Sequence, residues 1–217
     1  MPASPPPTPA AAHAAQSTAE QDSVLINLAG RQRMLSQRLA LQALLLTQGD
    51  AQAQALARQV LDEFSAAHRL LSRGGRELPA PSGALHAAFF GPDGANAPVQ
   101  AYIALGEQLL RSQGPAQAQA LRGLLDQASA MLARLHRVTQ VCEAQARARA
   151  VQAEQRRGEL LGQIGAIAGE ARVISLNARI VAARAGTSGQ EFAVIAARLT
   201  QVSEQIERLS SRALTGG

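Results

Sequence analysis

Residues 164–209, IGAIAGEARVISLNARIVAARAGTSGQEFAVIAARLTQVSEQIERL, decide the fold class of this chain. Apolar residues recur there at alternating spacings of three and four on both sides of the turn Gly186-Thr187-Ser188-Gly189. This heptad spacing places them on one face of a helix, and the period-two alternation of a strand is missing. The pattern predicts an antiparallel coiled-coil hairpin whose outward faces can join other helices. Its two seams are Ile164, Ile167, Ala171, Ile174, Ala178, Val181 and Ala185, then Phe192, Ile195, Leu199, Val202, Ile206 and Leu209.

The residues before this hairpin also predict helices. A proline-free run from Ala116 to about Ala185 predicts one long helix, and a leucine stripe that starts near Asp22 or Ser23 predicts another, ending near Thr47. Further helices are expected between residues 50 and 74 and over about 99–113. Aromatic residues make up only 2% of the chain, so Ala, Leu, Val and Ile must fill the core. We therefore expect an all-α protein in which an antiparallel helical bundle continues through a long helix into the hairpin.

These boundaries divide the chain into three parts. Residues 1–21 are rich in Pro and Ala and predict a disordered tail. Residues 22–150 form the expected helical bundle, and residues 151–217 form the hairpin.

The net charge of +5 and the pI near 11 come from arginine, which supplies all 21 basic residues. These arginines alternate with Glu, Asp and Gln, and bases would find few aromatic rings to stack on, so we expect no nucleic-acid binding. No apolar run approaches the ~20 residues of a membrane span, and residues 1–22 do not resemble a signal peptide. The sequence thus predicts a cytoplasmic protein without membrane insertion.

Catalytic and metal-binding patterns are missing from the sequence. The histidines His68, His86 and His136 lie far apart, and no HExxH, GxSxG or glycine-rich phosphate loop occurs. Cys142 is the only cysteine and is best interpreted as a small apolar filler. We therefore expect no enzyme activity, no metal and no cofactor.

One stretch of the first helix breaks its leucine stripe: Gly30-Arg31-Gln32-Arg33. A glycine inside a helix costs ~1 kcal/mol relative to alanine, so it often marks close approach of a ligand or of another backbone. If two copies of this helix meet about a twofold axis, the paired Arg33 side chains repel each other unless an anion lies between them. The alternative is a solvated arginine face.

The run Ile26–Leu39, INLAGRQRMLSQRL, resembles the signature helix of the type IV pili methyl-accepting chemotaxis transducer N-terminal domain, a segment also found in nitrate-sensing histidine kinases. The resemblance implies a helical-bundle sensor that dimerises and binds nitrate or nitrite at the subunit interface. It assigns the anion clamp to Arg33. The other residues that it places at the site are Gly30, Arg31, Met34 and Ser36.

A second resemblance covers residues 164–212, which are similar to the hairpin tip of methyl-accepting chemotaxis proteins. It implies contacts with a chemotaxis histidine kinase, its coupling protein and other receptors. The chain departs from the family pattern at Val181 and Thr187, where glutamate is usual, and at Arg198. It ends soon after the turn, so we expect no methylation helix. The tip residues that match or differ are Asn177, Val181, Arg184, Gly186, Gly189, Phe192 and Val194.

Together these features predict a homodimeric, chemoreceptor-like transducer that senses nitrate, nitrite or a similar small anion and relays the signal through the hairpin tip to a kinase complex. Two alternatives stay open. One is a helical adaptor that does not sense and joins receptor arrays, and the other is a nucleic-acid-binding protein.

Overall fold

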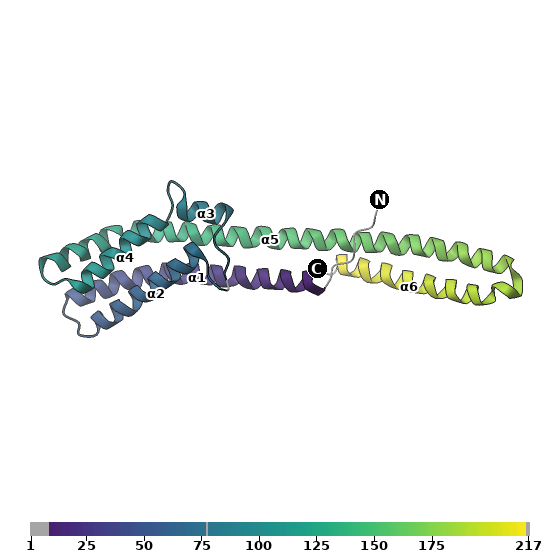
Figure 1. Ribbon diagram of the computed structural model, residues 1–217, viewed down its shortest axis with the longest axis horizontal. Coiled ribbons are helices and arrows are strands. Elements are labelled where there is room, and N and C mark those ends of the chain that lie inside the picture. Colours follow the sequence, from purple (N-terminus) through teal and green to yellow (C-terminus); the bar gives the residue numbers. More distant parts are fainter. Residues whose placement is uncertain (1–8, 77, 216–217) are drawn as a thin grey trace. The chain divides into compact units, whose positions relative to one another are not determined.

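The described part of the chain is α-helical in the computed structural model, which covers residues 9–76 and 78–215 (Figure 1). Six α-helices and one short 3-10 helix, η1, lie in these residues, and no strand occurs among them. The all-α fold class is therefore confirmed. The elements are α1 (Pro9–Thr47), α2 (Ala53–Arg73), α3 (Gly83–Phe90), α4 (Asn96–Arg111), α5 (Pro115–Arg184), η1 (Gly186–Gly189) and α6 (Gln190–Thr215).

The chain divides into two compact units, Met1–Ala148 and Arg149–Gly217. The boundary lies two residues before the division expected from the sequence. Helix α5 belongs to both units, so the backbone passes from one to the other without a loop.

The first unit is a bundle in which α1 packs on α2 and both contact α4. Its core holds the largest fully buried side chains of the described residues. Phe64 of α2 and Tyr102 of α4 meet edge to face, with ring centroids 6.0 Å apart. Full burial of one such side chain contributes roughly 1.5–3 kcal/mol, so a few large residues hold the bundle together. The others are Phe89, Leu35, Leu39, Leu61, Leu71, Leu109, Leu124, Met131 and Leu135.

Helix α1 begins earlier than the sequence analysis predicted. It starts at Pro9, whereas the predicted start lay near Asp22 or Ser23. The predicted tail of residues 1–21 is therefore helical from residue 9 onward, and residues 1–8 lie outside the described residues. The physical reason is that Pro9 suits the first position of a helix, and the alanines that follow have the highest helix propensity of any residue.

The second unit is a hairpin in which small residues fill the contact between the end of α5 and α6. The positions that are buried there are Ala168, Ser175, Ala182, Gly189, Ala196, Ser203 and Ser210. Small side chains let two helix backbones approach closely, so the large residues are displaced to the outside. The predicted seam is thus not what joins α5 to α6. Its large members on the surface are Ile164, Ile167, Ile174, Val181, Phe192, Ile195, Leu199, Val202 and Leu209, each at least 39% exposed.

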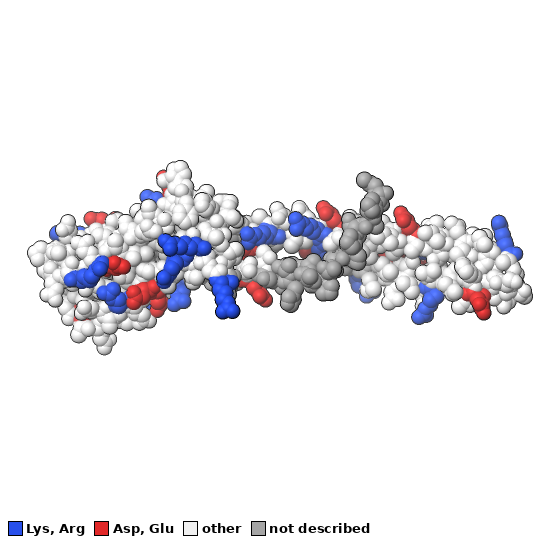
Figure 2. Space-filling view, in the orientation of Figure 1, with Lys and Arg blue, Asp and Glu red and all other residues white. Residues whose placement is uncertain are grey.

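Charged side chains are scattered over both units. On the face drawn in Figure 2, basic side chains are separated by uncharged surface, and several adjoin acidic ones. Ion pairs such as Arg172–Glu207 across the hairpin (3.3 Å) account for part of this mixing. Among the described helices, none combines the length and the apolar character that crossing a membrane requires.

Candidate functional site

Helix α1 turns the predicted ligand residues to different sides of the bundle. Ala29, Leu35 and Leu39 are buried, which sets the core-facing side of the helix. Because each residue turns an α-helix by about 100°, Arg31 and Arg33 point to nearly opposite sides. The five predicted residues, Gly30, Arg31, Arg33, Met34 and Ser36, therefore do not converge on one site within a single chain.

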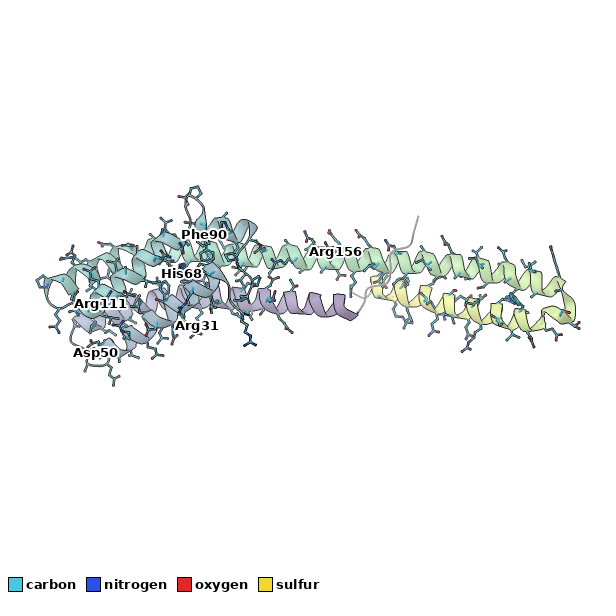
Figure 3. All side chains as sticks on the ribbon, viewed as in Figure 1. Arg31, Asp50, His68, Phe90, Arg111 and Arg156 are labelled. Atoms are coloured by element: carbon cyan, nitrogen blue, oxygen red, sulfur yellow. The ribbon has the colours of Figure 1, made fainter. Side chains whose placement is uncertain are left out.

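Arg31 is engaged with the neighbouring helix. Figure 3 labels Arg31 on the bundle. The Arg31 Nη2 atom donates to the Oε2 atom of Glu63 on α2 at 2.8 Å, and the two side chains are 56% and 28% exposed. Hydrogen bonds from Gln59 and from Arg31 lower the pKa of the Glu63 carboxyl. The charge of Arg31 is thus already neutralised by a carboxylate.

Arg33 has a different partner. Its Nη1 lies 2.8 Å from the Nδ1 atom of His136 on α5. A guanidinium carries only donors, so the imidazole must accept this hydrogen bond and is neutral in this arrangement. Within the residues that the structure describes, no carboxylate forms an ion pair with Arg33. Its positive charge therefore has no carboxylate partner among the described residues.

Gly30 and Met34 lie on the outward side of α1. A Cβ atom built on Gly30 meets nothing within 4 Å, so the close approach that we expected at this glycine does not involve the chain itself. Met34 is 52% exposed and Leu41, two turns further on, is 53% exposed. The outward side of α1 is therefore an open surface with apolar side chains beside Arg33.

Ser36 lies in the core. Its Oγ donates to the backbone oxygen of Arg33 at 2.7 Å, and the Tyr102 hydroxyl donates to the backbone oxygen of Ser36 at 3.3 Å. Burial raises the pKa of Tyr102 to about 12, which keeps its hydroxyl protonated as a donor. Ser36 thus fixes the backbone behind Arg33 and does not face a surface ligand.

Gln32 is fully buried between these residues, and neither its Nε2 nor its Oε1 has a hydrogen-bond partner among the described residues. A buried polar group without a partner costs about 1–3 kcal/mol. Within the described residues, nothing compensates for the burial of this carboxamide.

His68 on α2 is a second buried polar group of this unit. Its Nε2 lies 3.0 Å from the Oδ1 atom of Asn96, and its Nδ1 has no partner among the described residues. Burial lowers the pKa of His68, against the hydrogen bond with Asn96, which raises it. The imidazole is therefore held neutral inside the bundle.

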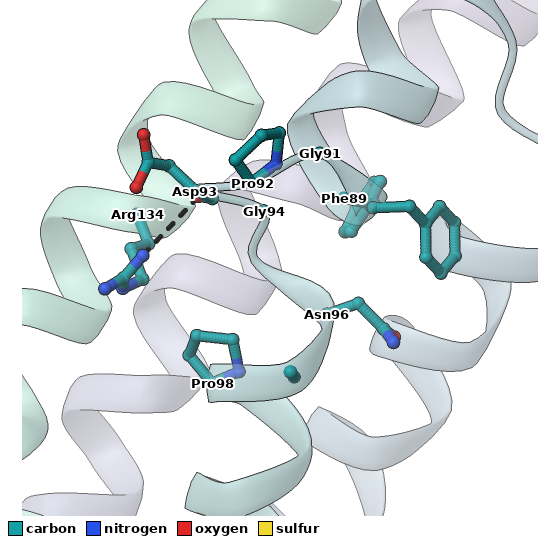
Figure 4. A pocket seen from close by; sticks show the side chains of 10 residues that line it. Phe89, Gly91, Pro92, Asp93, Gly94, Asn96, Pro98 and Arg134 are labelled. Atoms are coloured by element: carbon teal, nitrogen blue, oxygen red, sulfur yellow. Dashed lines mark hydrogen bonds between the residues drawn. The ribbon is translucent and has the colours of Figure 1, made fainter.

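The connection between α3 and α4 borders a shallow hollow of about 410 Å³ (Figure 4). Phe89, Pro92 and Asn96 line it, together with Arg134 of α5. The Arg134 Nη1 donates to the backbone oxygen of Asp93 at 3.4 Å. None of the residues singled out in the sequence lines this hollow.

Metal and thiol chemistry receive no support from the described residues. No group of three His, Cys, Asp or Glu side chains that could hold a metal ion occurs in that part of the chain. Cys142 is buried in the core of the first unit, and burial raises the pKa of its thiol to about 11. A thiol that stays protonated is a poor nucleophile, which is consistent with a filler.

Two glycines build the turn of the hairpin. Gly186 has a φ of +61°, a conformation that residues with a side chain rarely adopt. A Cβ atom on Gly189 would overlap the backbone oxygen of Ala182 on α5. Both positions therefore require glycine for the chain to reverse between α5 and α6.

The other predicted tip residues surround this turn and are exposed. Val181 is 66% exposed, Phe192 65% and Val194 70%. Asn177 and Arg184 on α5 are exposed as well. The structure thus brings the predicted tip residues to one end of the hairpin and leaves them accessible.

These observations define an all-α chain with a helical bundle, in which Arg33 has no carboxylate partner among the described residues, and a hairpin with an exposed apolar tip. Residues 14–91, less than half of the chain, match the family described as the type IV pili methyl-accepting chemotaxis transducer N-terminal domain. The match includes α2, α3 and the part of α1 that carries Arg33. No curated protein and no solved structure matches the chain.

Sequence reasoning identified Arg33 but missed its partner. His136 lies 103 residues further along the chain, and no motif connects the two. The sequence holds one weak signal for this pairing: Arg33 and His136 each lie at the border between the apolar and the polar side of their helix. That signal is too weak to pair two helices without knowledge of their register.

Proposed function

We propose that this chain is a chemotaxis-type signal transducer in which Arg33 binds a small planar oxyanion, nitrate or nitrite, between two copies of α1. The hairpin of the second unit passes the change to a chemotaxis histidine kinase and its coupling protein. The observation that carries the proposal is that Arg33, inside the segment that matches the transducer family, contacts an imidazole of α5 and no carboxylate of the described residues.

The contrast between the two arginines supports the assignment to Arg33. Arg31 forms an ion pair with Glu63 at 2.8 Å, whereas Arg33 contacts the neutral imidazole of His136. Arginine presents planar donors that fit a planar oxyanion in a bidentate manner. The remaining donors of Arg33 can therefore bind nitrate without first breaking an ion pair.

The outward side of α1 supports a homodimer. The open space at Gly30 accommodates a second backbone, and Met34 and Leu41 are exposed apolar residues on that side. Two copies of α1 in contact there place two Arg33 side chains near one another. An anion between them relieves the repulsion and couples ligand binding to the dimer interface.

The hairpin supports the output part of the proposal. Its exposed apolar stripe, defined as the nine surface residues Ile164 to Leu209 named above, suits a second hairpin as a partner. The accessible tip around Phe192 and Val194 remains for contacts with other proteins. In this interpretation α5 carries the signal, since it runs unbroken from His136 to the tip.

The test is a calorimetric titration with nitrate, at constant chloride, of the wild type and of two single variants. We expect heat of binding at millimolar nitrate for the wild type and for Arg31→Ala, and none for Arg33→Ala. Circular dichroism should show the same helix content for all three. Absence of binding by the wild type would refute the sensor proposal, and loss of binding in Arg31→Ala alone would move the site to the other side of α1.

A second candidate function is favoured by the exposed apolar stripe itself: an adaptor that joins receptor arrays through its hairpin without sensing an anion. It predicts that the wild type binds receptor hairpins equally well with and without nitrate. Co-sedimentation with receptor arrays in the two conditions separates the two functions.

A further inference from the structure

The contact between Arg33 and His136 restricts the protonation state of the imidazole. The Nη1–Nδ1 distance of 2.8 Å is that of a hydrogen bond, and only the imidazole can accept it. The Nδ1 atom must therefore carry its lone pair, with the ring proton on Nε2. The observed arrangement belongs to neutral His136.

Protonation of His136 changes its Nδ1 atom from a hydrogen-bond acceptor to a donor. Both ring nitrogens then donate, and two positive groups face each other without an acceptor between them. A planar oxyanion has three acceptor oxygens and one negative charge. It can accept one hydrogen bond from the guanidinium and one from the imidazolium, which converts a repulsive pair into a two-donor site.

We infer that His136 is a second ligand of the anion, and that binding at Arg33 takes up one proton onto the Nδ1 atom of His136. The inference rests on the proposed anion site at Arg33. In the binding step the hydrogen bond between Arg33 and His136 breaks, a proton from solvent is added to Nδ1, and each side chain donates to the anion. Affinity for nitrate therefore rises as the pH falls.

The residues one turn away from His136 and from Arg33 carry no ionisable side chain. On α5 its neighbours one turn away, Leu132, Ala133, Thr139 and Gln140, are uncharged. On α1 the neighbours of Arg33 one turn away, Ala29, Gly30, Ser36 and Gln37, are uncharged as well.

The carboxylates closest in sequence or contact already form ion pairs, and the other charged groups are guanidinium groups. Glu143, two turns further on α5, pairs with Arg147 at 3.8 Å, and Glu63 of α2 pairs with Arg31. Arg134 donates to the Asp93 backbone, and Arg137, next to His136 in the sequence, is a guanidinium, which carries donors only. The proton linked to anion binding is thus assigned to His136.

The same step links the ligand to the helix that leaves the bundle. His136 lies on α5, which continues to Arg184 at the hairpin turn. Binding replaces a direct bond between α1 and α5 by a bond through the anion. The anion therefore changes how α1 is held against α5, which is the kind of differential contact that a ligand needs to shift a conformational equilibrium.

The experiment is a nitrate titration of the full chain by calorimetry at about pH 6 and about pH 8, each in two buffers that differ in ionisation enthalpy. The buffers report the number of protons taken up per anion. For the wild type we expect uptake of up to one proton per nitrate, and an affinity that rises by up to about tenfold per pH unit as the pH falls. His136→Gln should bind nitrate with no proton uptake and no pH dependence, and His86→Gln should behave as the wild type.

Two results would overturn the inference: wild-type binding that takes up no proton, or His136→Gln binding with the wild-type pH dependence. The proton count on the wild type needs no variant, so it decides the matter even if His136→Gln fails to fold. Absence of nitrate binding by the wild type at both pH values would instead refute the proposed anion site. The two failures are therefore distinguishable.

Discussion

The two units of this chain distribute their large apolar residues in opposite ways. In the first unit Phe64, Tyr102 and Leu135 point inward and are almost completely buried. In the second unit Ala168, Ala182 and Ala196 occupy the inside, and Ile174 and Phe192 lie on the surface at 67% and 65% exposure. The sequences of both units have the periodicity of amphipathic helices. Periodicity alone therefore does not show whether the apolar face of a helix is buried within the chain or left on its surface.

The difference teaches which unit depends on a partner. A bundle that buries its large residues internally gains most of its hydrophobic stabilisation without help. A hairpin that buries only Ala, Ser and Gly gains little, because these side chains remove little apolar surface from water. We therefore expect the first unit to be stable as a single copy and the second to be completed by another hairpin.

The largest expected effect comes from creating a cavity in the core of the first unit. Phe64→Ala removes a fully buried ring that packs on Tyr102 and should lower the free energy of unfolding by about 3–5 kcal/mol. Urea unfolding followed by circular dichroism measures this. The matched control is Leu56→Ala on the same helix, which removes a side chain that is 37% exposed and should cost much less. Equal losses would show that α2 does not face the bundle as described.

A charge in the exposed stripe of the hairpin tests the other half of the comparison. Leu199 is 49% exposed in the single chain, so Leu199→Asp should weaken association of hairpins at least about 100-fold, or about 2.8 kcal/mol. Sedimentation equilibrium measures the change. Gln201→Asp adds the same charge at an exposed polar position two residues away and should leave association intact. Unchanged association in Leu199→Asp would mean that the stripe is not an interface between copies.

Gln32 is a fully buried residue of the first unit whose carboxamide has no hydrogen-bond partner among the described residues. Gln32→Met keeps a similar shape and removes the two unpartnered polar atoms, so it should raise the free energy of unfolding by about 1–3 kcal/mol. Gln37→Met on the exposed side of α1 is the control and should have no comparable effect. A loss of stability in Gln32→Met would indicate that the carboxamide has a partner that the single chain lacks.

The smallest expected effect concerns His68 and acid. Burial lowers the pKa of His68 in the folded chain below its ordinary value of 6.5, so the unfolded chain binds the proton more readily. Its contribution to stability is therefore present above about pH 6.5 and is lost as the pH falls below it. His68→Gln, which can still bond to Asn96, should be less sensitive to acid than the wild type between about pH 7.5 and pH 5. His86→Gln, at an exposed histidine, should follow the wild type, and parallel curves for all three chains would contradict this account.

Much of the fold could be predicted from the sequence because it depends on local signals. The glycine turn at Gly186 and Gly189 and the proline-free run before it specify the hairpin and α5 without knowledge of other elements. The start of α1 was missed, since the prolines before Pro9 outweighed the helix propensity of the alanines after it. The inside of the hairpin was missed as well, because its small residues leave no hydrophobic signal.

The candidate site was predictable only in part. The broken stripe on α1 singled out Arg33, and the resemblance added Gly30, Arg31, Met34 and Ser36, whose roles as ligands stay predictions. The ion pair of Arg31 and the burial of Ser36 depend on how α1 is packed, which no residue in that segment reveals. His136 comes from a helix 103 residues away, and only the three-dimensional arrangement pairs it with Arg33.

The central claim is that Arg33 holds an anion, and a crystal structure of the chain grown in nitrate tests it most directly. The account predicts a planar oxyanion within about 3 Å of the Arg33 guanidinium, between two copies of α1, with His136 as a further donor. A nitrate-grown structure in which Arg33 still bonds to His136 alone, with no anion beside it, would contradict the account.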